Sequence, residues 1–102
     1  MNIQHVNDAP KVNYNLDGHI LCTLAGVEVV HLSLKPGEKI DKHINPNDVI
    51  FFVLESKAMF ETDTEKKLVA KDQTIFVPGG INRGIENISV AIFKVLVIKT
   101  IA

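Results

Sequence analysis

The chain has 102 residues, with 11 basic and 12 acidic side chains and a pI near 6.4. A domain of this length buries roughly two-thirds of the surface that its unfolded chain exposes, so a single domain with one core is expected over residues 1–102. The balanced charge offers no extended field for attracting nucleic acid or anionic lipid. We therefore expect neither of these as a partner.

The N-terminal residues and the cysteine content bear on compartment. Residues 1–11 contain no apolar segment behind a basic start, so we predict no signal or transit peptide. The apolar runs are far shorter than the roughly 20 residues of a membrane span. Cys22 is the only cysteine, and free cysteines are among the most buried residue types, so we expect its thiol to be buried. These features together predict a cytoplasmic protein.

The composition favours β-structure. Val, Ile and Thr supply 29 residues whereas Ala and Leu supply 14, and β-branched side chains suit pleated sheets better than helices. No segment longer than a turn has apolar residues at helical spacing without an equally good alternating pattern. The sequence therefore predicts an all-β domain of about eight to ten short strands, with no substantial helix.

The first half of the chain contains two turn signals. The Asp-Gly pair at 17–18 is typical of a two-residue hairpin turn, and we expect strands on both sides of it. His5 and His19, in an N-terminal tail and beside that turn, are expected to be exposed. A strand is predicted at 27–34 (VEVVHLSL), and the sequence KPGE at 35–38 ends it, because proline and glycine suit the two central positions of a turn.

The second half begins with a charged turn at 41–42 that leads through His43 into a strand at 49–55, VIFFVLE. This strand is apolar at both alternating positions, so both its faces should be covered, either by a barrel interior together with a second sheet or by a partner subunit. Further strands are predicted at 57–64, 68–70, 74–77 and 88–100, with turns at 65–67 and 78–80. The apolar strands 49–55 and 88–100 lead us to expect a homodimer.

The order of these features resembles that of a small single-domain cupin. The family's scaffold residues are retained at Pro36, Gly37, Pro78 and Asn87. The resemblance implies a cupin-type double-stranded β-helix, the RmlC-like jelly-roll barrel, in residues 27–100. Residues 1–26 would then supply N-terminal strands and an arm.

The family's metal ligands are largely replaced in this chain. The first cupin motif has a histidine, a second histidine two residues later, a glutamate four residues further on, and a glycine seven residues beyond that. The second motif has a proline and then a histidine five residues later. The residues at these places are His43, Asn45, Val49 and Ser56 in the first motif, and Pro78 and Arg83 in the second. Only His43 keeps the residue type of a metal ligand.

Arg83, the only arginine, is placed by the resemblance at the mouth of a barrel pocket. A guanidinium presents a planar set of donors to carboxylate or phosphate, and it stays charged at physiological pH. At 4 Å from a divalent ion it would oppose binding by roughly 8 kcal/mol at an effective dielectric constant of about 20. We therefore predict a protein that binds an anionic or carboxylate-bearing small molecule, without a metal cofactor. The predicted pocket residues are His43, Asn45, Val49, Phe51 and Arg83.

Two alternatives stay open. A metal-dependent cupin enzyme, of isomerase or dioxygenase type, would hold one divalent transition metal through His43 together with His31 or Asn45. The alternation in strand 27–34 does not decide whether His31 faces inward. If a metal is bound, Arg83 points to solvent. The other alternative is a domain that serves mainly in assembly. The sequence leaves open whether any reaction is catalysed.

Overall fold

The computed structural model describes residues 1–101, which form nine strands and one short 3-10 turn. The elements are η1 (Val6–Asp8), β1 (Asp17–Leu24), β2 (Val27–Leu34), β3 (Lys39–Ile44), β4 (Val49–Glu55), β5 (Lys57–Thr62), β6 (Lys66–Ala70), β7 (Thr74–Val77), β8 (Asn82–Glu86) and β9 (Phe93–Thr100). The prediction of an all-β domain with no substantial helix is confirmed.

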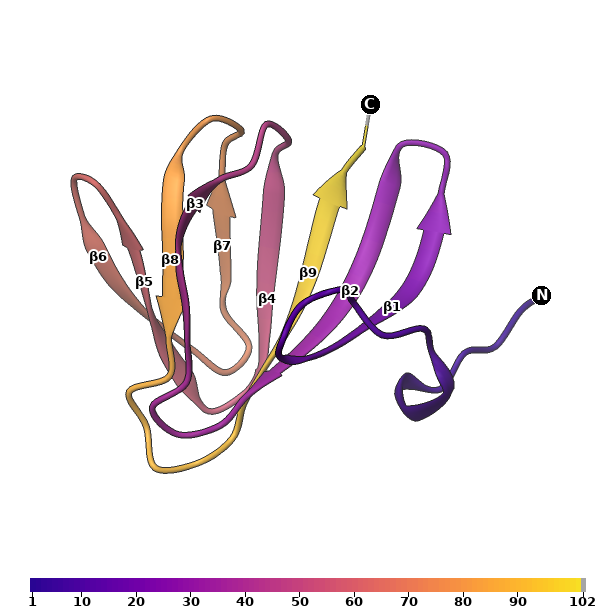
Figure 1. The fold of residues 1–102 in the computed structure, drawn as a ribbon, viewed down its shortest axis with the longest axis horizontal. Helices are drawn as coiled ribbons and strands as arrows, with labels where there is room; N and C mark the ends of the chain where they lie inside the picture. Colours follow the sequence, from indigo (N-terminus) through magenta and orange to yellow (C-terminus); the bar gives the residue numbers. More distant parts are fainter. Residues whose placement is uncertain (102) are drawn as a thin grey trace.

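The strands form two sheets that face each other (Figure 1). The five-stranded sheet has the order β1-β2-β9-β4-β7, and the four-stranded sheet has the order β3-β8-β5-β6. Every pairing within them is antiparallel. The C-terminal strand β9 lies between β2 and β4, so the two strands with the most continuous apolar sequence are neighbours at the centre of one sheet. This arrangement is the predicted double-stranded β-helix.

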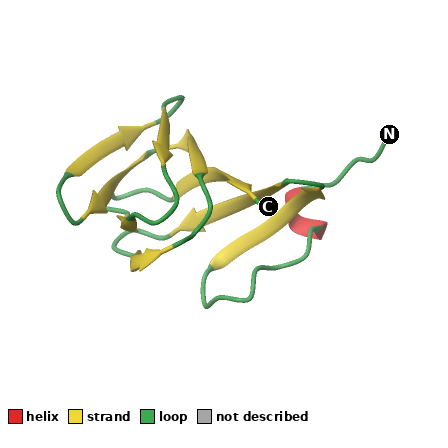
Figure 2. Ribbon diagram, turned by 90° about the horizontal axis from the view of Figure 1, so that it is seen from above, coloured by secondary structure: helices red, strands yellow, loops and turns green. Residues whose placement is uncertain are grey.

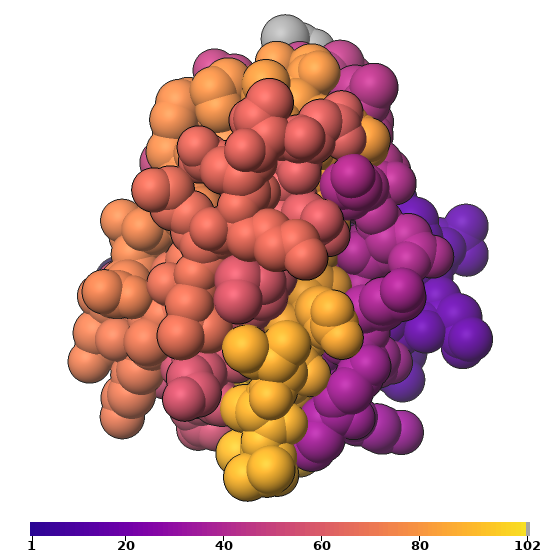
Figure 3. Space-filling view, turned by 90° about the vertical axis from the view of Figure 1, so that its left-hand side faces the viewer, coloured from indigo at the N-terminus to yellow at the C-terminus, as the bar shows by residue number. Residues whose placement is uncertain are grey.

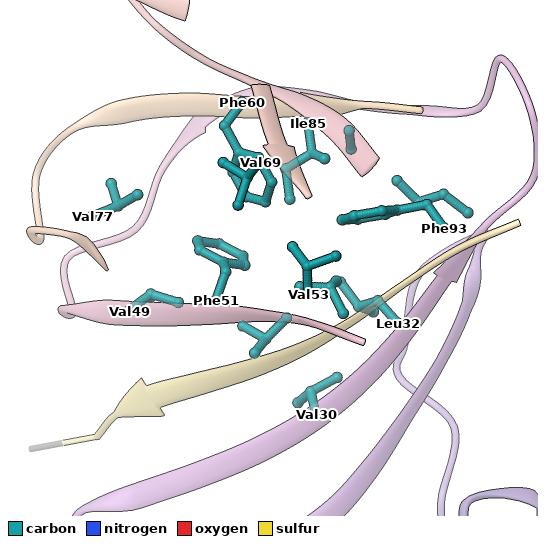
Figure 4. Close-up of a cluster of buried hydrophobic side chains, with 14 residues drawn as sticks. Val30, Leu32, Val49, Phe51, Val53, Phe60, Val69, Val77, Ile85 and Phe93 are labelled. Carbon is teal, nitrogen blue, oxygen red and sulfur yellow. The ribbon is translucent and has the colours of Figure 1, made fainter. Parts of the chain in front are cut away.

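The core fills the space between the sheets (Figure 4). Alternate residues of the strands point inward, as in Val49, Phe51 and Val53 of β4, which are at most 3% exposed. Phe60 makes edge-to-face contacts with Phe51 and Phe93, with ring centroids 5.1 and 6.3 Å apart. Burial of such a side chain contributes roughly 1.5–3 kcal/mol, so this alternation is what holds the two sheets together.

The five-stranded sheet extends beyond the four-stranded one at β1 and β2, and η1 lies beside β1 at this end (Figures 1 and 2). The segment between η1 and β1 runs back along β1, since Val12 N–H donates to Gly18 O at 2.9 Å. The side chains of Val12 and Leu16 pack against the core. This N-terminal segment therefore covers the inner face of the sheet where the second sheet ends.

The predicted Asp-Gly hairpin turn at 17–18 is wrong. Both residues belong to β1, and the β1–β2 hairpin turns instead at Ala25 and Gly26, where Gly26 has a φ of 85°. Gly18 is needed for space and not for a turn, because a Cβ there would lie 2.6 Å from Leu32 Cδ2. The turn at 35–38 is confirmed, with Gly37 at a φ of 81° and Glu38 N–H donating to Lys35 O.

Strands β3 and β8 were not predicted from the sequence. Residues 41–42 belong to β3, not to a charged turn, and 82–86 form a strand in place of a loop. β3 is an edge strand exposed at five of its six residues, so it lacks an apolar alternation. Three boundaries were also wrong, the first of them the end of β5, which is Thr62 and not residue 64. Lys66 and Lys67 start β6 instead of forming a turn, and β9 starts at Phe93, not at 88.

The outer faces of the two sheets differ. On the five-stranded sheet, the outward positions of β2 and β9 are divided evenly between four apolar side chains, Val27, Val29, Leu96 and Ile98, and four polar ones, His31, Ser33, Lys94 and Thr100. Cys22 is exposed on the same sheet, so the expected buried thiol is wrong. Figure 3 views the molecule from the side of the other sheet, where β5 and β6 cover much of the surface and β3 follows one edge.

Candidate functional site

A cavity of about 200 Å³ lies between the sheets, at the end where β3 and β8 face β2 and β9. Its third side is formed by the N-terminal segment. The lining residues are Val12, Tyr14, Leu16, Val30, Leu32, Ile40, His43, Asn45, Phe51, Arg83, Gly84, Ile85, Val97 and Lys99. Of the five predicted pocket residues, four line this cavity. Val49 does not, since it is fully buried in the core beside it.

Arg83 is the main charged group of the cavity. It is only 6% exposed, and its Nη1 has no hydrogen-bond partner among residues 1–101. The six ion pairs found in that part of the chain do not include it. Its guanidinium carbon lies 5.6 Å from the centre of the Phe51 ring, a cation–π contact. Burial lowers the pKa of the Arg83 guanidinium, although arginine stays protonated at physiological pH.

Strand β8 aims Arg83 inward because it shares a face with Ile85, which is buried in the core. Between the two, Gly84 lets β3 approach closely, since a Cβ there would lie 2.7 Å from Ile40 O and 3.0 Å from Lys42 N. The pairing of β3 with β8 shifts at this point, between Ile40 and His43. Gly84 therefore permits the irregularity that sets His43 directly opposite Arg83.

His43 is at the rim of the cavity and is largely exposed. Its Nδ1 lies 3.2 Å from Asp41 O, and because a carbonyl oxygen only accepts, this contact places a proton on Nδ1. In the neutral ring, Nε2 is then left as an acceptor. His43 thus offers one polar atom at the mouth of the cavity.

Asn45 lines the cavity, but its side chain is already engaged. Oδ1 accepts a hydrogen bond from Asn47 N–H at 2.9 Å, which fixes the turn around Pro46. Its carbonyl oxygen accepts from Gly80 N–H at 2.8 Å. Gly79 lies against the same turn, where a Cβ would approach Pro46 O to 2.2 Å. Asn45 therefore joins two loops at the cavity mouth, and its oxygen is not free to bind a ligand strongly.

Lys99 is a cavity residue that the sequence analysis missed. Its Nζ lies 3.3 Å from Oε1 of Glu28, and both side chains are about three-quarters buried. The signal was present in the alternation of β9, which puts Lys99 on the same face as Val95 and Val97. Tyr14 was missed as well. It comes from the N-terminal segment, for which no element had been predicted beyond an arm.

Comparison with known proteins supports the architecture. The family model described as Cupin domain matches residues 30–99, more than half of the chain. This chain belongs to the cupin family. Among solved structures, a Cupin 2 conserved barrel domain protein from Salinispora arenicola is 17% identical with a TM-score of 0.86, over 100% of this chain and 90% of that one. No match was found among curated proteins.

Two further structures are similar in fold. TT1209 from Thermus thermophilus is 20% identical with a TM-score of 0.82, covering 98% of this cupin and 97% of that protein. The polyketide cyclase RemF from Streptomyces resistomycificus is 15% identical with a TM-score of 0.86, covering 98% of this cupin and 79% of that protein. Because all three are less than 25% identical to it, these similarities concern the fold alone.

The residues at the family's metal-ligand places do not form a suitable donor set in this cupin. His43 supplies one imidazole, Asn45 Oδ1 is bonded within a turn, and Val49 has no donor atom. A buried guanidinium lies across the strand pair from His43. Residues 1–101 contain no cluster of three or more His, Cys, Asp or Glu side chains that could hold a metal ion. A divalent ion here would have one good ligand and a facing positive charge.

His31 does not lie in the cavity. Val30, Leu32 and Leu34 point into the core, so His31 is on the outer face of the five-stranded sheet, paired with His19 of β1. The expectation that His31 could serve as a second metal ligand beside His43 is therefore wrong. His19 is not exposed as expected either. Its side chain is 12% exposed and contacts Ala9 O and Asp17.

None of the helical structure in residues 1–101 is long and apolar enough to cross a lipid bilayer.

Proposed function

We propose that this cupin binds a small anionic molecule in the cavity through Arg83, without a metal ion. The supporting observation is the buried guanidinium, whose Nη1 has no hydrogen-bond partner among the described residues. A buried polar group without a partner costs roughly 1–3 kcal/mol, and more when it is charged. An anion bound by the Arg83 guanidinium would offset this cost by forming charge-assisted hydrogen bonds.

The position of Arg83 suits this role better than a structural one. The Phe51 ring makes a cation–π contact with the guanidinium, which partly stabilises the charge, whereas Nη1 has no hydrogen-bond partner among residues 1–101. Nε2 of His43 and the hydroxyl of Tyr14 lie among the lining groups that could contact the same ligand. The proposed activity is binding, and it requires no reaction.

Binding can be tested by thermal unfolding with acetate, benzoate and inorganic phosphate at constant ionic strength. A ligand at 100 times its Kd stabilises the native state by about 2.7 kcal/mol, which raises the melting temperature by several degrees. We expect at least one of these anions to do so in the native protein, a reduced shift in Arg83→Lys, and no shift in Arg83→Met.

Lys71→Met provides a matched control, because it removes a cation from an exposed turn. It should leave the shift unchanged. If no anion stabilises the protein in a manner that depends on Arg83, the proposed function is wrong. The proposal that no metal ion is bound has its own test, in which Fe(II), Mn(II), Ni(II) or Zn(II) is added to chelator-treated protein. A stabilisation by one of these ions that is lost in His43→Ala would contradict it.

We also propose that this cupin forms a homodimer through the outer face of the five-stranded sheet. Leu24, Ile50 and Phe76 are 61%, 42% and 57% exposed on this sheet, and Phe52 and Ile98 are half-buried beside them. From the spacing and rise of strands, the face measures roughly 20 by 25 Å. The resulting footprint of roughly 500 Å² is smaller than the roughly 800 Å² of accessible surface that each partner buries in a typical stable complex, but protruding side chains add to it, and a twofold axis would match the same surface on both copies.

Light scattering on the native protein should then give a mass twice that of the 11.3 kDa chain. Ile50→Glu places a charge between Phe76 and Ile98 on this face and should yield a monomer. Leu68→Glu is the matched control, since Leu68 is 49% exposed on β6 of the other sheet, and it should stay dimeric. A native protein that is monomeric at micromolar concentration, or a dimer that survives Ile50→Glu, would exclude this interface.

A further inference from the structure

The cavity contains two cations, but only one of them lacks a counter-ion. Lys99 is paired with Glu28 at 3.3 Å, and this pair is largely shielded from solvent. Arg83 has no carboxylate partner among residues 1–101. None of the residues that line the cavity is an Asp or Glu. The cavity therefore carries one uncompensated positive charge, which a ligand with a single negative charge would neutralise.

A second negative charge would have no partner. Moving a charged group out of water is costly unless an opposite charge compensates it. A phosphate ester or a dicarboxylate would leave one negative charge without a cation, unless it displaced Glu28 from Lys99. The charge arrangement thus favours a monoanion over a dianion.

The rest of the cavity is apolar and small. Eight of its fourteen lining residues carry aliphatic or phenylalanine side chains, among them Val30, Leu32 and Val97 on one sheet and Ile85 on the other. A cavity of about 150 Å³ with such a lining holds benzene. The volume here, about 200 Å³, accommodates one ring of that size together with a carboxylate.

We propose that the ligand is a monocarboxylic acid with an apolar body about the size of a single ring, such as an aryl carboxylate or a short branched acyl carboxylate. This inference rests on the proposed anion binding. The carboxylate lies against the guanidinium of Arg83, and the apolar body fills the space between Phe51 and the inner face of β2 and β9. The Glu28–Lys99 pair stays closed and excludes a second negative charge.

Isothermal titration with four probes tests this class. Benzoate is the reference, benzamide has the same ring without the charge, acetate has the charge without the ring, and phenyl phosphate has the ring with a dianion above pH 7. We expect benzoate to bind about tenfold or more tightly than benzamide and acetate, because a charge-assisted hydrogen bond and a buried ring each exceed the free energy of one decade. Phenyl phosphate should bind more weakly than benzoate.

The claim that the cavity has only one uncompensated positive charge is tested separately with Glu28→Gln, which removes the counter-ion of Lys99. This variant should raise the affinity for phenyl phosphate relative to benzoate by about threefold or more, since a second cation becomes available. The control is Glu55→Gln, because Glu55 pairs with Lys94 at 3.9 Å outside the cavity and the change in net charge is identical. It should leave the ratio unchanged.

The outcomes separate this inference from the function on which it rests. Acetate binding as well as benzoate would show that the apolar lining does not select the ligand. Phenyl phosphate binding more tightly than benzoate would show that the ligand is not a monoanion. An unchanged ratio in Glu28→Gln would show that the Glu28–Lys99 pair does not exclude a second negative charge, so the argument for a monoanion would fail. In these cases Arg83-dependent anion binding stands and the proposed ligand class is wrong. If none of the probes binds in a manner that depends on Arg83, both proposals fail.

Discussion

Two polar side chains are buried among residues 1–101, and they differ in whether their hydrogen bonds are satisfied. Asn87, which is fully buried, donates from Nδ2 to Leu34 O and Ala91 O, at 2.9 and 2.8 Å. Its Oδ1 accepts from the backbone N–H and the hydroxyl of Ser89. At the other end of the barrel, Arg83 has an Nη1 that no group in residues 1–101 satisfies.

The difference separates a structural role from a binding role. Asn87 fixes the loops at the closed end of the barrel, where its backbone also bonds to Gly37 and Glu38. All its bonding capacity is used within the chain, so removing it should cost stability. Arg83 leaves capacity unused at the cavity, so it lowers stability in the absence of ligand and is available to a ligand. Burial alone does not distinguish the two residues, whereas hydrogen-bond satisfaction does.

The substitution with the largest expected effect on stability is at Asn87, at the closed end of the barrel. Asn87→Ala removes four hydrogen bonds and leaves Leu34 O without its partner in the core, so it should lower the free energy of unfolding by about 2–4 kcal/mol. Urea denaturation monitored by circular dichroism gives this value. Asn2→Ala, at an exposed residue, should change it by less than about 0.5 kcal/mol. Equal effects of the two substitutions would contradict a structural role for Asn87.

The next effect is expected beside the cavity. Gly84→Ala forces a Cβ to within 2.7 Å of Ile40 O, so β3 must move, at a cost of about 1–3 kcal/mol. Because this movement changes the position of His43 relative to Arg83, anion binding should weaken as well. Gly37→Ala is a useful comparison, since its Cβ would meet nothing within 4 Å and its cost would come only from the positive φ. That variant should lose stability without losing affinity.

A smaller effect of opposite sign is expected at Arg83 itself. Arg83→Met replaces an unpaired buried cation by an apolar side chain of similar length, so the free energy of unfolding should rise by about 1 kcal/mol. Urea denaturation in a buffer free of carboxylate and phosphate measures this change. A loss of stability of more than about 1 kcal/mol in Arg83→Met would mean that Arg83 is structural, as Asn87 is.

The sequence predicted the fold better than the site, for a physical reason. Strands buried on alternate residues, such as 27–34, 49–55 and 74–77, were predicted with their observed boundaries. Positions that are buried require apolar side chains, so such strands are recognisable as apolar runs in the sequence. The strands that carry His43 and Arg83 face a cavity on one side and solvent on the other. Their residues therefore do not alternate in polarity, and both strands were missed.

Within the site, residues could be predicted only where a pattern marked them. His43, Asn45 and Arg83 occupy places that the cupin resemblance defines, and all three line the cavity. Tyr14 comes from an irregular segment with no pattern, and the pairing of Lys99 with Glu28 depends on the register of β2 with β9. The charge balance of the cavity follows from that register, which a single sequence does not reveal.

The smallest effect concerns His31, a half-buried titratable group outside the cavity. It is packed against Asp17 and His19 of β1 and Lys94 of β9, and its pKa is lowered from 6.5, mainly by burial and then by the charge of Lys94. As pH falls, His31 therefore becomes protonated in the unfolded chain before it does in the folded protein. The free energy of unfolding consequently decreases as pH falls from 6.5 toward the lowered pKa of folded His31. Between pH 7.5 and 5.5 the urea midpoint should fall less in His31→Gln than in the native protein. His5→Gln, at an exposed residue, should retain the native dependence, and an identical pH dependence in all three proteins would show that the burial of His31 has no energetic consequence.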